Sequence, residues 1–214
     1  MKKSLLSIAL TSLLATSAVV STQASATGIE GLSANVGAVS QYIFRGIEQT
    51  STASASAGLD YEFGDFSVGT WTADVEDGLE IDFYGSYALA LDSGLGLSAG
   101  FTTYQYTGDF DTQYNEINLG ASYSFLSIAY SVGTWEVEGA DDQDYDFLAI
   151  TAEYEGFYAT YGTWGDEFDG DYVELGFGTE VSGFDVGVAL IANSKELSGE
   201  KSDESLVFSI GKSF

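Results

Sequence analysis

The chain has 214 residues and contains no Cys, Pro or His, and its 33 acidic residues face only six basic ones. Without His and Cys, neither a Ser–His nor a Cys–His nucleophile pair can form, and acidic pairs are too frequent here to indicate an enzyme. The formal net charge of −27 argues against nucleic acid as a partner, because a phosphate backbone must be met by cations.

The first 26 residues are typical of a secretory signal. Lys2 and Lys3 open it, an apolar run covers Leu5–Val20, and the small residues Ala24–Ala26 form a cleavage site. A transmembrane anchor is the alternative, but polar residues interrupt the run and no stop-transfer charges follow it. We therefore expect an exported protein that is cleaved near Ala26 and whose mature part, residues 27–214, is one domain.

The carboxyl-terminal segment alternates strictly. Leu206, Phe208 and Ile210 alternate with other residues, and the chain stops on Phe214. A period of two predicts a β-strand. A strand that ends on a bare aromatic carboxyl terminus resembles the closing strand of a bacterial outer-membrane β-barrel. Phe214 is therefore expected to be the contact for the barrel-assembly machinery.

The mature chain contains no apolar run near the roughly 20 residues of a spanning helix. Its apolar residues are spread one in two among Gly, Ser and Thr, as in a membrane barrel, although a soluble β-sandwich would also alternate. The export signal, the terminal Phe and the aromatics near strand ends favour the barrel. We predict an all-β fold, a transmembrane antiparallel up-and-down barrel of about twelve strands in the bacterial outer membrane, with ten strands as the alternative.

Twelve segments carry the alternation. They are Gly31–Phe44, Ser51–Phe63, Asp65–Ala73, Leu79–Leu91, Leu95–Tyr106, Tyr114–Phe125, Leu126–Val137, Asp146–Tyr154, Phe157–Trp164, Tyr172–Val181, Phe184–Ala192 and Glu204–Phe214. Connections after even-numbered segments are tight, whereas those after odd-numbered segments are longer and mostly acidic. Outer-membrane barrels have short periplasmic turns and longer external loops, so both termini are expected on the periplasmic side.

Residues 41–50 read QYIFRGIEQT, followed by GLDYE at 58–62 and VGTW at 68–71. This ordered set resembles the TorF family, proteobacterial porins of the outer membrane, and the closing KSF at 212–214 fits it as well. Glu48 stands where that family more usually has Ser. The resemblance implies a membrane barrel with a pore, and it carries no substrate with it.

Residues opposite the apolar faces should point into the lumen. An outward charge near the bilayer midplane costs about 2–4 kcal/mol for Arg or Lys and less for acids, which favours the inward placement. Rings of Asp and Glu attract cations and repel anions. The candidates for lining the pore are Arg45, Asp60, Glu62, Glu80, Asp82, Glu116, Glu153, Glu174 and Asp185.

Arg45 has few basic neighbours in the sequence, and we expect it to brace Asp60 or Glu62 and to help set a constriction. The pattern predicts a passive diffusion channel for small solutes or ions with a weak cation preference. The alternative is a non-conducting structural or adhesive barrel that is filled by paired side chains and acts through acidic external loops.

A short pattern, VGTW or YGTW, recurs three times and contains all three Trp residues. By alternation each Trp shares the inward face with a Gly two positions earlier. One interpretation is an aromatic collar that stacks on a sugar or a cation. The other is that each Trp covers a neighbouring Gly, or that a bulge turns it outward into the interfacial girdle. The residues are Trp71 with Gly69, Trp135 with Gly133 and Trp164 with Gly162.

Acidic loops at 141–144 and 166–171 have oxygen ligands at alternate positions, which can suit Ca²⁺. Neither matches the full twelve-residue calcium loop, so we expect no discrete metal site and no cofactor. Solvated loops bridged to lipopolysaccharide by loosely held ions fit the pattern better. The expected surroundings are outer-membrane lipid and lipopolysaccharide outside the barrel and small solutes or cations inside it, and the pattern leaves monomer and trimer open.

Overall fold

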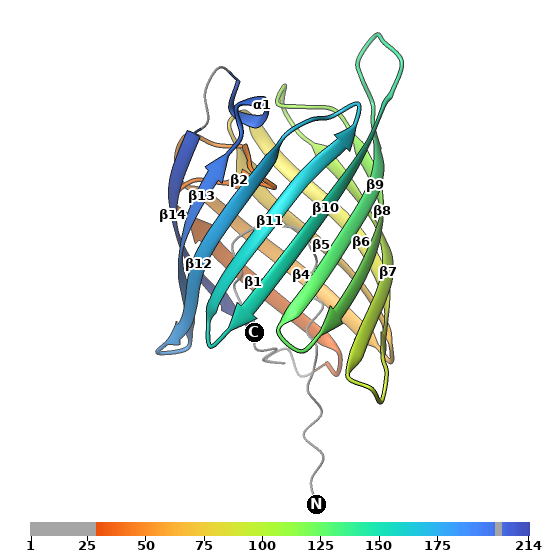
Figure 1. Ribbon diagram of the computed structural model, residues 1–214, viewed down its shortest axis with the longest axis vertical. Coiled ribbons are helices and arrows are strands. Elements are labelled where there is room, and N and C mark those ends of the chain that lie inside the picture. Colours follow the sequence, from red (N-terminus) through yellow and green to blue (C-terminus); the bar gives the residue numbers. More distant parts are fainter. Residues whose placement is uncertain (1–28, 200–202) are drawn as a thin grey trace, which may run out of the picture.

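A computed structural model describes residues 29–199 and 203–214. The predicted leader, residues 1–26, lies outside the described residues. Twelve antiparallel strands close into one barrel in the order β1-β14-β13-β12-β11-β10-β9-β8-β7-β6-β5-β4 (Figure 1). The prediction of a twelve-stranded antiparallel barrel is therefore confirmed, and the alternative of ten strands is wrong.

The elements follow the chain as an up-and-down meander. Two very short strands, β2 and β3, pair with each other outside the main sheet. No helix among the described residues is long and apolar enough to cross a membrane. The elements are β1 (Leu32–Val39), β2 (Ile43–Phe44), β3 (Ile47–Glu48), β4 (Ser54–Phe63), β5 (Phe66–Val75), β6 (Gly78–Ala90), β7 (Leu95–Tyr106), β8 (Tyr114–Tyr123), β9 (Leu126–Trp135), β10 (Gln143–Tyr154), β11 (Phe157–Asp166), β12 (Asp171–Val181), β13 (Phe184–Asn193), α1 (Lys195–Ser198) and β14 (Asp203–Ser213).

The first and last strands join to close the barrel. Ala38 lies opposite Ile210, and the amide of Phe214 donates to the carbonyl of Ala34 at 2.8 Å. The amide of Ala34 donates in return to the carbonyl of Phe214 at 3.1 Å. In hydrocarbon every backbone polar group needs a partner inside the protein, so this closure is the condition for spanning a membrane.

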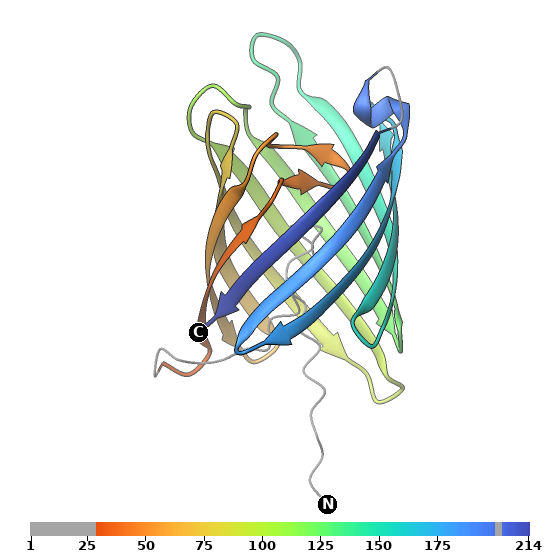
Figure 2. The same ribbon diagram turned by 90° about the vertical axis from the view of Figure 1, so that its left-hand side faces the viewer.

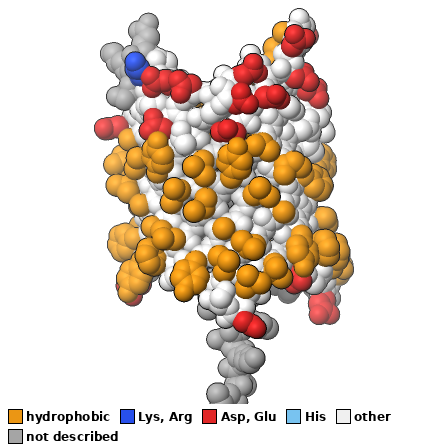
Figure 3. Space-filling view, turned by 45° about the vertical axis from the view of Figure 1, so that its right-hand side comes forward, with side chains coloured by type: hydrophobic (Ala, Val, Ile, Leu, Met, Phe, Trp, Pro, Cys, Tyr) orange, Lys and Arg blue, Asp and Glu red, His pale blue; other side chains and the backbone are white. Residues whose placement is uncertain are grey.

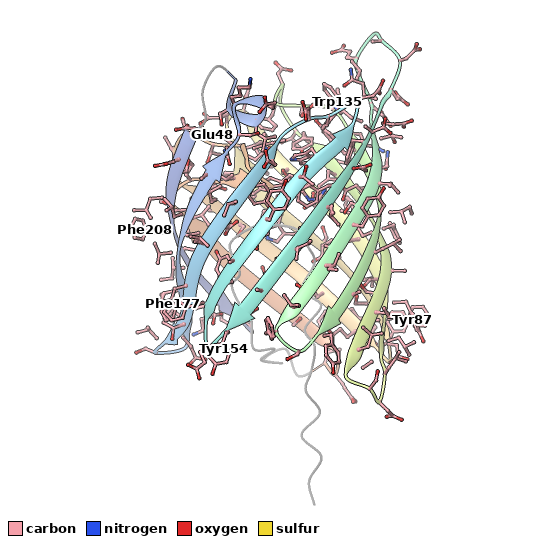
Figure 4. The ribbon with its side chains drawn as sticks, in the orientation of Figure 1. Glu48, Tyr87, Trp135, Tyr154, Phe177 and Phe208 are labelled. Atoms are coloured by element: carbon pink, nitrogen blue, oxygen red, sulfur yellow. The ribbon has the colours of Figure 1, made fainter. Side chains whose placement is uncertain are left out.

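The outer surface is a belt of apolar side chains, as the strand alternation predicts. Leu206 is 55% exposed and Phe208 is 56% exposed. Figure 3 shows apolar side chains over the barrel wall, with acidic side chains gathered above them. Phe208, Phe177 and Tyr87 project from the sides of the ribbon in Figure 4. A closed barrel with such a belt has the outer surface of a membrane-spanning protein.

The two ends of the barrel differ in their connections. The turn end has the tight connections 64–65, 91–94, 124–125, 155–156 and 182–183, and Phe214 also lies there. The loop end has the connections 40–53, 76–77, 107–113, 136–142, 167–170 and 194–202. The predicted alternation of short and long connections holds with two exceptions: the loop-end connection 167–170 is no longer than the turn-end connection 91–94, and 76–77 is short. Val75 pairs with Gly78, so the predicted loop Asp74–Gly78 is only a tight turn.

The largest departure from the sequence prediction lies at residues 40–53, which we call the inward loop. The first predicted strand, Gly31–Phe44, is too long, because β1 ends at Val39 and the chain then folds into the lumen (Figure 2). Tyr42 and Phe44, which the alternation assigned to the apolar outer face, are buried and half-buried inside. A short hairpin alternates with the same period as the strand before it, so the pattern alone did not reveal the bend.

Candidate functional site in the lumen

The inward loop is built around a tight hairpin. Phe44 faces Ile47, and the two residues between them, Arg45 and Gly46, have φ values of 49° and 85°. Two consecutive positive φ values are the signature of a type I′ turn, whose second position favours Gly. The side chains of Leu197 and Tyr172 approach Gly46 so closely that a Cβ would overlap them. The turn therefore sits against α1 and β12.

The barrel wall holds both carbonyls of the turn. Trp164 Nε1 donates to the carbonyl of Arg45 at 3.0 Å, and Asn193 Nδ2 donates to the carbonyl of Gly46 at 2.6 Å. These donors come from β11 and β13. The tip of the hairpin is thus fixed in position rather than left free in the lumen.

The Arg45 side chain forms a two-pronged ion pair with Glu116 of β8. Its Nη1 lies 2.5 Å from Oε1, and its Nη2 lies 3.1 Å from Oε2. The same carboxylate accepts the hydroxyls of Tyr104 at 2.8 Å and Tyr145 at 3.1 Å. Arg45 Nη2 also donates to Ser131 Oγ at 3.2 Å. Bidentate geometry and extra donors are what a desolvated ion pair needs in order to be favourable.

The expected pairing of Arg45 with Asp60 or Glu62 is wrong. Both acids lie near the turn end of β4, whereas the hairpin carries Arg45 to β8 and β9 at the loop end. Asp60 instead accepts the hydroxyl of Tyr84 at 2.6 Å. A linear sequence cannot show this crossing, because residues 45 and 116 are brought together only when the loop folds inward.

Aromatic rings surround the guanidinium of Arg45. Its Cζ lies 4.4 Å from the ring centroid of Phe147 and 4.8 Å from that of Phe44, and only 2% of Arg45 is exposed. A desolvated cation over aromatic faces gains roughly 2 kcal/mol or more from the ring quadrupoles. The combination of Glu116 on one side and rings on the other makes Arg45 the main anchor of the inward loop.

The opposite side of the loop has its own contacts. Tyr42 donates its hydroxyl to Glu80 Oε1 at 2.9 Å, and its ring meets that of Trp71 edge-on with centroids 5.8 Å apart. Nearer the rim, Gln41 Nε2 donates to Glu48 Oε2 at 2.6 Å. The exposed Glu76 accepts from Ser51, and this hydrogen bond lowers the pKa of the Glu76 carboxyl.

The predicted lumen acids fall into two sets by their height in the barrel. Glu80, Asp82, Glu116 and Glu174 are buried in the loop-end half. Asp60, Glu62, Glu153 and Asp185 lie toward the turn end, where Glu62 and Glu153 are exposed and the other two are half-buried. All eight sit on the face opposite the apolar belt, as the alternation predicts, and their role as pore-lining groups stays a prediction.

The three Trp residues stay on the lumen side. Trp164 is buried against the hairpin, while Trp135 stacks on Tyr114 with ring centroids 5.7 Å apart and donates from Nε1 to Asp111 at 3.0 Å. Trp71 packs on Tyr42. No bulge turns them outward, and their role as a collar for a sugar or a cation stays a prediction.

The glycines of the repeated pattern have a different cover from the one expected. Each lies opposite a Tyr of the next strand, and the Tyr ring occupies the space of the missing side chain. The pairs are Gly69 with Tyr84, Gly133 with Tyr145 and Gly162 with Tyr172. Thus Tyr from the neighbouring strand covers each Gly, while the Trp two residues later is free to pack on the inward loop or its neighbours.

Sequence reasoning missed several residues that hold the loop. Tyr104, Ser131, Tyr145, Phe147 and Asn193 all contact Arg45, Glu116 or Gly46. One signal was present. Large aromatic residues stand on the polar face of their strands near the loop end, where an open pore would need small ones. Among the described residues, no group of three or more Asp and Glu side chains is arranged to hold a metal ion.

A family model for a bacterial protein of unknown function, Gcw_chp, matches residues 23–163. The chain belongs to the Gcw_chp family. The match covers about two thirds of the chain, from before β1 into β11. It includes the inward loop and both members of two of the three Gly–Tyr pairs. The resemblance to the TorF family stays a prediction. No curated protein matches this Gcw_chp chain.

Solved structures are similar to this chain at low identity. A structure from work on the in-meso crystallization of membrane proteins has a TM-score of 0.58 at 9% identity, covering 86% of this chain and 83% of that one. Pseudomonas aeruginosa OprD gives a TM-score of 0.46 at 11% identity, covering 87% of this chain and 67% of that one. Pseudomonas aeruginosa OpdL gives 0.45 at 11% identity, covering 87% and 68%. The first of these likenesses concerns the barrel fold alone, and the other two carry no further conclusion.

Proposed function

We propose that this protein is an outer-membrane channel that passes small polar solutes or ions by passive diffusion, with a weak cation preference. The observation that carries the proposal is the contrast between the two faces of one closed wall. The outer face is apolar all round, whereas the inner face carries acids, hydroxyls and glycines. A barrel of this kind separates lipid from a polar interior.

The turn-end half of the lumen supports a path for solutes. Its wall is lined largely by Gly, Ser and Ala, which leave space in the interior. Representative positions are Ser33, Ser67, Ser86, Ser98, Gly120, Ser122, Ser127, Gly178, Gly187 and Ser209. Any solute that enters there meets the inward loop next, so that loop is the constriction of the proposed channel.

The charges of the lumen support a cation preference. Arg45 is the only buried basic residue among those described, and Glu116 already neutralises it. The other buried acids, Glu80, Asp82 and Glu174, face no basic partner. Because charge in a narrow, low-dielectric passage acts strongly on ions, the net negative interior favours cations over anions.

The alternative function is a closed barrel that acts through its outer loops. Its specific support is the dense packing of Arg45, Tyr42 and Ile43 at the loop end, where all three are buried. If the inward loop never moves, this half of the lumen is a plug and the acidic rim remains the working surface.

Purified protein inserted into planar lipid bilayers separates the two functions. A channel gives steady ohmic current steps, and a salt gradient across the bilayer gives a reversal potential of the sign that cation preference requires. A complete absence of steps, with insertion of folded barrels verified independently, would overturn the channel and leave the closed barrel. An anion-selective reversal potential would overturn the cation preference alone.

A further inference from the structure

Asp82 occupies an unusual place in the lumen wall. It is 0% exposed, and neither of its carboxyl oxygens has a hydrogen-bond partner. It alternates on β6 with the outward residues Ile81 and Phe83, so its side chain is directed into the barrel. Burying a charged group without a partner costs several kcal/mol, so this carboxyl group must either hold a proton or meet a positive partner that the described residues do not supply.

A second buried acid, Glu80, increases the need for a positive charge beside Asp82. Glu80 lies two residues away on the same face of β6 and is also buried. It receives the hydroxyl of Tyr42, and its carboxyl group meets that of Asp82. Two ionised carboxylates are both acceptors, so this contact is satisfied only by a shared proton or by a cation. Arg45, the only buried basic residue among those described, is already engaged by Glu116. Within the part of the chain that the structure describes, no basic side chain therefore balances the pair.

Aromatic side chains flank the pair. Trp71 of β5 and Tyr104 of β7 lie directly opposite Asp82 on its two neighbouring strands. The ring of Tyr42 packs on Trp71 from the inward loop. Aromatic faces attract weakly hydrated cations, whereas a small divalent ion such as Mg²⁺ gives up its water reluctantly.

We propose that Glu80 and Asp82 form a binding site for a weakly hydrated monovalent cation of the size of K⁺. The cation supplies the positive charge that the carboxylates lack, and Tyr42 couples the site to the inward loop through its hydrogen bond to Glu80. If the protein is the proposed channel, this site is where its preference for cations arises. That part of the inference rests on the proposed function. Binding itself does not require conduction.

The first test is thermal unfolding of the detergent-solubilised protein at constant ionic strength, with K⁺ exchanged for the bulky N-methylglucammonium ion. A ligand that binds the folded state raises Tm with the logarithm of its concentration, here on the order of 3–5 °C for each tenfold increase above Kd. Asp82→Asn should abolish this dependence, and Glu80→Gln should weaken it. Asp142→Asn, the same substitution in an exposed loop, should retain it.

The second test is crystallographic and does not depend on the variants' stability. Crystals of the full barrel soaked in thallium(I), which has the size of K⁺ and a strong anomalous signal, should show an anomalous peak beside Asp82. An unchanged K⁺ dependence in Asp82→Asn, or the absence of a peak in the wild-type protein, would overturn the site. So would a Tm that depends on pH but not on K⁺, because protons would then neutralise the pair.

The two proposals can fail separately. A barrel that is silent in bilayers but shows the thallium peak loses its channel function and keeps the site. A barrel that conducts cations and shows neither the peak nor the K⁺ dependence keeps its channel function and loses the site.

Discussion

The two halves of the lumen share one wall and one strand alternation, yet they are filled in opposite ways. The loop-end half contains Arg45, Phe147, Trp164 and Tyr172, all buried around the inward loop. The turn-end half is lined mainly by Gly, Ser and Ala and has exposed acids such as Glu62. The comparison teaches that large side chains fill only one half, and that the segment at the centre of this filling, the inward loop, is not part of the barrel wall.

Replacing the inward loop should produce the largest effect. If residues 41–49 are exchanged for a short Gly-Ser linker, the wall strands keep their pairing while the filling of the loop-end half is lost. We expect single-channel conductance in planar bilayers to rise several-fold. Trimming the exposed connection 136–142 is the matched control and should leave conductance within a small fraction of the wild-type value. Equal conductance in both variants would mean that the loop is not the constriction.

Breaking the buried ion pair should have the next largest effect. Arg45→Ala leaves Glu116 buried without its cation, and we expect the free energy of unfolding in urea to fall by about 3 kcal/mol. The double variant Arg45→Ala with Glu116→Gln removes the charge while Gln still accepts from Tyr104 and Tyr145, so it should recover part of that loss.

The size of this loss also tests the contrast between the halves. A loss below about 1 kcal/mol, as for an exposed ion pair, would indicate that water reaches Arg45 and that the loop-end half is wetter than its packing implies.

A pair of Gly→Ala substitutions should give the smallest and most local difference. Gly162→Ala places a methyl group where the rings of Tyr172 and Phe147 already lie, and we expect a loss of about 1–3 kcal/mol. Gly187→Ala meets chiefly the hydroxyl of Ser209, which can rotate, so it should be neutral or stabilising by up to about 1 kcal/mol. Urea unfolding of both variants measures the difference. Similar losses would contradict the looser packing of the turn-end half.

Several features of the fold were predictable from residue order because they depend on short-range alternation. Leu206, Phe208 and Ile210 point outward, and Glu80, Asp82 and Glu174 point inward, as a period of two requires once one face is apolar. The twelve strands follow from the same pattern together with the tight turns between them. The largest misplaced boundary, at Val39, falls where a hairpin continues the alternation.

The candidate site was only partly predictable. The QYIFRGIEQT segment is distinctive and points to Arg45, but the sequence prediction places its partner at Asp60 or Glu62 on the next predicted strand. Glu116, Phe147 and Asn193 come from β8, β10 and β13, and nothing in their local sequence links them to residue 45. The Tyr–Gly pairing of neighbouring strands was likewise hidden, because it depends on register.

The sequence by itself determined an acidic barrel with an apolar outer surface, because side-chain direction in a strand is set by the backbone and repeats every second residue. Tertiary structure alone decided which half of the interior is filled, and by what. The inward loop finds its partners only in the closed barrel. The charges and rings it meets there come from strands far apart in the chain, which the barrel brings within contact distance.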